Sequence, residues 1–159
     1  MRKTGTLAVV AVLAAAVLAA GSSPALAGPR ARIDLSSQSG ELTLGSDGSA
    51  VVTGYVTGSP LDGDYTAVLT ADDGSLPEPG ATESASATVT VVGPHGRTLV
   101  LTGTGTVEGK WTDEVYQATH VFIGRYTAES SVRRADGTDG WFSVGLGTEA
   151  RGYVEAFDS

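Results

Sequence analysis

Side-chain character alternates along short segments of this chain, and this pattern restricts the fold more than any other feature. In residues 97–107, Leu99, Leu101 and Val107 share one parity with two glycines, whereas threonines dominate the other parity. A period of two residues is typical of a β-strand with one buried face. The leucine and glycine parity is predicted to face inward, where its glycines would leave room for a bulky side chain from another strand.

Similar segments recur along the chain, and no stretch after residue 27 has helical periodicity. Turn-forming Gly, Asp, Ser and Pro residues separate them. The predicted strands are residues 31–36, 41–44, 49–57, 64–70, 84–92, 97–107, 116–130, 140–147 and 151–157. The sequence therefore predicts an all-β fold, an antiparallel up-and-down β-barrel of about eight strands, with a two-sheet β-sandwich as the alternative. The barrel is preferred because the 22 glycines help a sheet to coil, and closure removes exposed edges.

The beginning of the chain has the pattern of a secretory signal peptide. Arg2 and Lys3 precede an apolar run over residues 7–20, and Ala25 and Ala27 stand where a signal peptidase cleaves. The 14-residue run is shorter than the roughly 20 residues of a membrane-spanning helix. We expect cleavage after Ala27, a secreted extracellular protein that is not membrane-bound, and a single domain over residues 28–159.

Composition excludes several classes of function. The chain has 18 acidic and 10 basic residues and a net charge of −8, which argues against nucleic-acid binding. It has no cysteine and only two histidines, so thiol catalysis, cysteine-ligated metals and a His-rich zinc site are not expected. Asp136 and Asp139 each precede a glycine, and hairpin turns explain that pattern without calcium. No metal and no cofactor are predicted.

Residues 116–153 contain most of the large aromatic side chains, and we expect them to supply much of the core. One parity of the strand at 116–130 is aromatic and is predicted to face inward. The candidate ligand-binding residues are Tyr116, His120, Phe122, Tyr126 and Trp141. His120 could orient a ligand or act as a general base. The interpretation that we favour is a core histidine bonded to a neighbouring backbone or hydroxyl group.

Two loops are candidates for an interaction surface. Residues 71–82 form a long irregular segment with two prolines, two glycines and three acids. Residues 108–115 carry Trp111, Asp113 and Glu114. A tryptophan in such a loop either plugs one end of a barrel or anchors a binding surface. No catalytic residue is assigned, because the chain has no G-x-S-x-G elbow and residue types without geometry do not define a triad.

Several segments together resemble a known group of proteins. They are GSPLDGDYTAVLTADDGSLPEPG (58–80), EGKW (108–111), ATHVFIGRYT (118–127), GTDGWFSVGLGTE (137–149) and VEAFD (154–158). This combination is similar to small, secreted, Ala/Gly-rich actinobacterial all-β proteins of unassigned function. The resemblance implies secretion and an all-β domain, and it supplies no site residues.

Three functions follow as hypotheses. The first is non-catalytic binding of a small apolar or amphipathic ligand inside the barrel. The second is an interaction or inhibitor module that binds an extracellular protein through residues 71–82 and 108–115. The third is an isomerase- or cyclase-type enzyme that uses His120. The sequence leaves the oligomeric state open.

Overall fold

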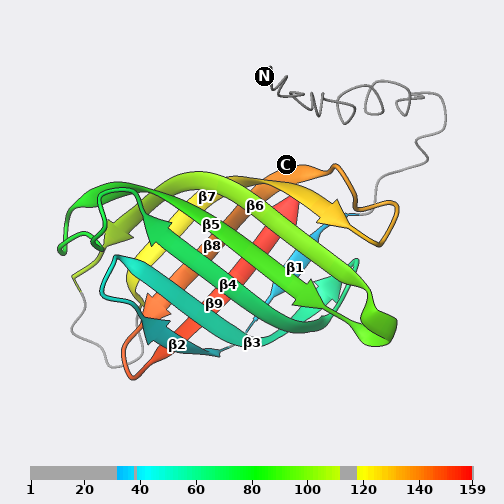
Figure 1. Cartoon of the computed structure of the whole chain (residues 1–159), viewed down its shortest axis with the longest axis horizontal. Coiled ribbons are helices and arrows are strands. Elements are labelled where there is room, and N and C mark those ends of the chain that lie inside the picture. Colours follow the sequence, from blue (N-terminus) through cyan, green and yellow to red (C-terminus); the bar gives the residue numbers. More distant parts are fainter. Residues whose placement is uncertain (1–31, 38, 112–117, 159) are drawn as a thin grey trace, which may run out of the picture.

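Nine antiparallel strands make up the described part of the chain, and they form one continuous sheet (Figure 1). The computed structural model describes residues 32–37, 39–111 and 118–158. The strands are β1 (Asp34–Ser36), β2 (Gly40–Leu44), β3 (Ser49–Ser59), β4 (Gly63–Ala71), β5 (Thr82–Val92), β6 (Thr98–Gly109), β7 (Ala118–Ser130), β8 (Asp139–Gly147) and β9 (Arg151–Asp158). A short 3-10 turn, η2 (Pro94–Gly96), joins β5 to β6. In the described part of the chain, no helix is long and apolar enough to cross a membrane.

The sheet closes on itself, which confirms the predicted barrel over the two-sheet alternative. The strand order is β1-β3-β2-β9-β8-β7-β6-β5-β4, and an additional β3–β4 pairing joins β4 at one end to β3 near the other. The short strands β1 and β2 both pair with β3 and with β9, at different heights along the barrel. Together they fill one strand position, so nine strands occupy eight positions around the barrel.

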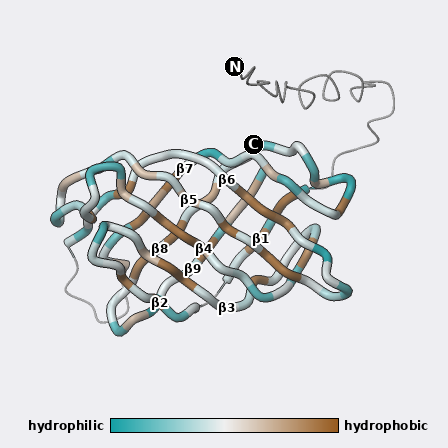
Figure 2. The backbone as a smooth tube through the Cα atoms, in the orientation of Figure 1, coloured by the Kyte–Doolittle hydropathy of each residue, from teal (hydrophilic) through white to brown (hydrophobic). Residues whose placement is uncertain are grey.

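Alternation decides which side chains enter the barrel. On β7, Phe122, Tyr126 and Ala128 are buried, which confirms the predicted inward parity over this part of the strand. On β8, Phe142 is fully buried and packs edge-to-face against both aromatic rings of β7, at ring-centroid distances of 5.2 Å to Phe122 and 5.8 Å to Tyr126. Figure 2 shows apolar residues concentrated along the strands and polar residues in the loops at the two ends.

The inward glycines of β6 have a different role from the one that the sequence suggested. A Cβ atom on Gly103 would collide with the backbone of Arg125 and Tyr126, and one on Gly105 with the backbone of Ile123 and Gly124. The backbone of β7, rather than a bulky side chain, therefore occupies the space at these glycines. This close approach allows the β6–β7 pair to bend and the sheet to coil shut.

The outer surface of the barrel differs from one wall to the other. On β5 and β6, the outward positions are mostly threonine, and Thr88 lies directly across from Thr102. On β7, β8 and β9, three large apolar side chains, Ile123, Trp141 and Phe157, are exposed on the outside. Trp141 and Phe157 are cross-strand neighbours.

Candidate functional site

The described parts of the two predicted interaction loops, residues 71–82 and 108–111, lie at one end of the barrel. β4 and β6 end here, and β5 and β7 begin here, because the four strands are consecutive antiparallel neighbours. Residues 72–81 connect the first pair, and residues 110–117 connect the second. Residues 72–81 and the described residues Lys110 and Trp111 therefore lie at the same end of the barrel, although about 30 positions separate them in the chain.

Backbone hydrogen bonds hold the first loop against the end of β6. The amide of Gly80 donates to the carbonyl of Gly109 at 2.8 Å, and the amide of Gly109 donates to the carbonyl of Ala81 at 3.0 Å. Pro79 and Gly109 form a parallel bridge. A Cβ atom on Gly109 would collide with the carbonyl groups of Pro77 and Glu78, so only glycine allows this contact.

His120 fixes the same loop from β7. Its Nε2 donates to the carbonyl oxygen of Pro77 at 2.9 Å, because a carbonyl can only accept. Its Nδ1 lies 3.1 Å from the hydroxyl of Thr119, and that hydroxyl donates to the carbonyl of Leu146 at 3.1 Å. The partners of the ring are thus a carbonyl and a hydroxyl, as the favoured interpretation predicted, but His120 is half-buried at the end of the barrel and does not lie in the core.

Trp111 projects from the same end of the barrel. Its side chain is 81% exposed. The preceding Lys110 is held by its amide, which donates to the carbonyl of Thr119 at 2.8 Å, and its ammonium group pairs with Glu108 at 3.1 Å. The indole nitrogen lies close to Gly80, where a Cβ atom would be 3.3 Å away. Trp111 therefore points outward from a hydrogen-bonded support rather than plugging the barrel.

The other candidates for the interaction surface and for the ligand site differ in position. Asp113, Glu114 and Tyr116 lie outside the described residues. Phe122 and Tyr126 lie in the core, as described above.

The position of Trp141 contradicts the prediction that this residue lines a ligand site inside the barrel. It lies on the outer surface, 38% exposed, with the guanidinium of Arg125 stacked 5.2 Å from its ring centroid. The alternation of β8 places Phe142, not Trp141, inside the barrel. Alternation predicts an inward aromatic face for β7, whereas glycines interrupt the pattern on β8.

The middle of the barrel is filled by side chains. Tyr126 is 2% exposed, and its hydroxyl finds no hydrogen-bond partner among the described residues. Burial, and next the charges of Asp158 and Asp139, raise the pKa of Tyr126 to about 12. Its phenol is therefore protonated at neutral pH and lies against Gly140, where a Cβ atom would collide with it. This geometry is that of a packed core side chain.

Comparison of the chain with known family models, with curated proteins and with solved structures found no match. The resemblance to small secreted actinobacterial proteins thus stays a prediction. The site is defined by its own geometry alone.

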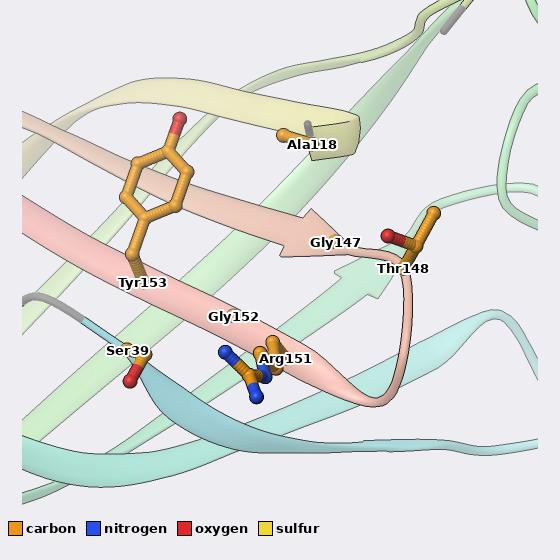
Figure 3. Close-up of a pocket in the computed structure, with 7 residues that line it drawn as sticks. All are labelled: Ser39, Ala118, Gly147, Thr148, Arg151, Gly152 and Tyr153. Atoms are coloured by element: carbon orange, nitrogen blue, oxygen red, sulfur yellow. The ribbon is translucent and has the colours of Figure 1, made fainter. Parts of the chain in front are cut away.

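A second feature, which the sequence pattern did not predict, lies on the outer wall at the same end. A pocket of about 190 Å³ opens beside the turn between β8 and β9, next to Tyr153 and Arg151 (Figure 3). Its position depends on which residues face each other across three strands. No motif in the sequence marks it.

Proposed function

We propose that the protein is a secreted, non-catalytic recognition module that binds another extracellular protein through the barrel end that carries Trp111. The observation that carries the proposal is the 81% exposure of Trp111 next to backbone that is hydrogen-bonded at Gly80, Gly109 and Lys110. Tryptophan is enriched among the few residues that contribute most of the binding free energy at protein interfaces. A support that is already ordered lowers the entropy lost on binding.

The packing of the interior supports this proposal over a ligand inside the barrel. Phe122, Tyr126 and Phe142 fill the middle of the barrel and contact one another. Two pockets lined by described residues lie at the outer surface, and none of these three aromatic residues lines either of them. An eight-strand barrel is wide enough to be filled by its own side chains, so a packed interior is an ordinary state for this fold.

Charge indicates the kind of partner. The chain carries a net charge of −8, and Asp72, Asp73 and Glu78 lie in the loop beside Trp111. A partner that accepts the indole in an apolar pocket with a basic rim would match this end of the barrel. Such complementarity speeds association and makes the rate sensitive to salt.

Secretion is part of the proposal and rests on residues 1–27. The charged start, the apolar run and the Ala25 and Ala27 pair form the pattern that a signal peptidase recognises. An extracellular place accords with a recognition role, and native mass spectrometry of the secreted chain would verify cleavage after Ala27.

The test is native mass spectrometry of the protein recovered from the culture medium of its own host, as wild type, as Trp111→Ala and as Trp141→Ala. We expect a complex with a second protein for the wild type and for Trp141→Ala, and the free chain for Trp111→Ala. Trp141 is a matched control because it is the other exposed tryptophan and lies on a different wall. A bound small molecule that survives both substitutions would overturn the proposal in favour of an interior ligand. Equal capture by both variants would also overturn it.

A further inference from the structure

One outward row of side chains crosses four neighbouring strands, and its two ends carry opposite charges. Figure 1 shows β7, β8 and β9 side by side on the wall behind β4, β5 and β6, and β1 pairs with β9. Cross-strand pairing aligns one outward residue from each strand, in the order Arg125, Trp141, Phe157 and Asp34. All four residues are exposed. The row therefore reads positive, apolar, apolar, negative across the wall.

The charges at the two ends of the row have no ion-pair partner among the described residues. The guanidinium of Arg125 stacks 5.2 Å from the ring centroid of Trp141 and makes no hydrogen bond or ion pair with a described residue. Asp34 likewise has no ion pair there. Three strand spacings, about 14 Å, separate the two residues, which is too far for a direct pair within one copy. Both charges therefore remain available to a second molecule.

We propose that this face binds a second copy of the chain around a two-fold axis that runs parallel to the strands, between Trp141 and Phe157. Such an axis reverses the order of the row on the facing copy. Arg125 then faces Asp34 of the second copy, Trp141 faces Phe157, and each pair occurs twice. The barrel wall curves away, so contact is closest at the rings, and the long Arg125 side chain reaches across at the edge. An apolar centre with a charged rim is the usual anatomy of an interface.

The charges also select this orientation over the other two-fold arrangement of the same face. An axis along the row would place Arg125 on Arg125 and Asp34 on Asp34 of the second copy, and like charges in contact are costly. With the axis along the strands, β7 begins on the same side in both copies. The two barrel ends that carry Trp111 therefore lie on one side of the dimer, where they could bind a clustered partner with avidity. The dimer itself does not depend on the role of Trp111.

The adjoining outward row fits the same axis. It also takes one residue from each of the four strands, in the order Ile123, Ser143, Glu155 and Ser36. When the axis reverses this row, the hydroxyl of Ser143 faces the carboxylate of Glu155, to which it can donate. Ile123 faces Ser36. No two like charges meet in either row.

The area of contact is small. The two rows contribute four residues each, or eight from each copy, whereas a standard interface uses roughly 20–30 residues on each side. The dimer is therefore weak, with an expected dissociation constant of about 10–100 µM. At the low concentration of a culture medium the chain is then a monomer, so Trp141→Ala keeps its use as the control for Trp111→Ala.

The test is sedimentation velocity of the secreted chain from about 1 µM to about 1 mM, a range that brackets the expected dissociation constant. We expect the wild type to pass from monomer to dimer, and Trp141→Ala to weaken the dimer at least tenfold. Val68→Ala is the matched control and should dimerise like the wild type. Val68 is also exposed and apolar, but it lies on β4, four strand positions from β8 in either direction around the barrel. A wild type that stays monomeric throughout, or a Val68→Ala variant that loses the dimer equally, overturns the proposal.

Charge reversal tests the two-fold pairing itself. Arg125→Glu alone would set two acids against each other in both pairs, and Asp34→Arg alone would set two arginines against each other. Each variant should therefore dimerise at least tenfold more weakly than the wild type. In a mixed dimer of the two variants, each pair again holds one acid and one arginine, so an equimolar mixture should regain the wild-type affinity.

Recovery in the mixture also shows that both variants are folded. Native mass spectrometry identifies the mixed dimer by its mass, which lies between the masses of the two homodimers. The proposal is overturned if the mixture stays monomeric, or if either variant alone dimerises as readily as the wild type.

Discussion

His120 donates a hydrogen bond over 2.9 Å to the carbonyl oxygen of Pro77, 43 residues earlier in the chain. This contact joins the beginning of β7 to the loop between β4 and β5. It explains why a histidine stands among apolar residues at the end of a strand: no apolar side chain could hold the loop in this way. The role of His120 in the structure is therefore to position the loop beside Trp111.

Removing this contact should loosen the loop. We expect His120→Ala to speed amide hydrogen exchange at Gly80 and Ala81. It should also lower the free energy of unfolding by about 0.5–1.5 kcal/mol, which is the usual net contribution of one hydrogen bond. His95→Ala is the matched control, because His95 is exposed in the η2 turn. Unchanged exchange at Gly80 in the His120 variant would contradict the role described for this residue.

Substitutions at two adjacent residues on β7 test which face of this strand points into the barrel. Phe122 is fully buried, whereas Ile123 is 53% exposed. We expect Phe122→Ala to lower the free energy of unfolding by about 3–5 kcal/mol, because it leaves a cavity in the core. Ile123→Ala should change it by about 0.5 kcal/mol. Urea unfolding measures both, and a Phe122→Ala loss below about 1 kcal/mol would be incompatible with the inward parity.

Tyr126 should make the fold sensitive to alkali. Burial, followed by Asp158 and Asp139, raises its pKa to about 12, whereas a tyrosine in the unfolded chain titrates near 10. The phenol is neutral in both states below pH 10, so its contribution is constant there. Between about pH 10 and 12 the unfolded state loses the proton first, and stability falls by up to about 1.4 kcal/mol per pH unit.

The Tyr126→Phe variant isolates that contribution. Its unfolding free energy should fall less steeply than that of the wild type above pH 10. At neutral pH the variant should be as stable as the wild type or slightly more so, because the hydroxyl that it loses has no partner among the described residues. Burial also raises the pKa values of Tyr65 and Tyr153, which add to the pH dependence of both proteins. The contribution of Tyr126 is therefore the difference between the slopes of the wild type and the variant. Identical slopes would show that Tyr126 titrates normally.

Gly145 and Tyr153 should behave as a coupled pair. A methyl group at Gly145 would collide with the Tyr153 ring, so Gly145→Ala should cost about 1–3 kcal/mol of stability. The same substitution in a Tyr153→Ala background should cost clearly less. A double-mutant cycle measures this difference, and additive effects of the two substitutions would mean that the ring does not lie over Gly145.

Chelation should leave the melting temperature unchanged. Asp136 accepts from the amide of Ser130 at 2.9 Å, and Asp139 accepts from the hydroxyl of Thr127 at 3.1 Å, so both carboxylates support the β7–β8 turn. No cluster of three or more potential ligand side chains that could hold a metal ion occurs among the described residues. Thermal unfolding with and without EDTA tests this expectation. A drop of several degrees would reveal an ion that stabilises this turn.

Sequence patterns predicted the strands well and the site only in part. The ends of β8 were predicted to within one residue, because Gly and Asp turns border it. The side that Trp141 faces was predicted wrongly, since Gly140, Gly145 and Gly147 leave few side chains from which to read the parity of β8. The outer pocket could not be predicted, because it is built from residues on separate strands.

The sequence by itself determined that the chain is all-β and that Phe122, Tyr126 and Ala128 share a face, because a strand alternates its side chains with a period of two. It also determined the absence of cysteine chemistry. Only the tertiary structure decided that β3 pairs with β4 to close the barrel, that His120 reaches Pro77, and that Tyr153 covers Gly145. The physical reason is that these contacts depend on the register and coiling of strands far apart in the chain, which local side-chain patterns do not encode.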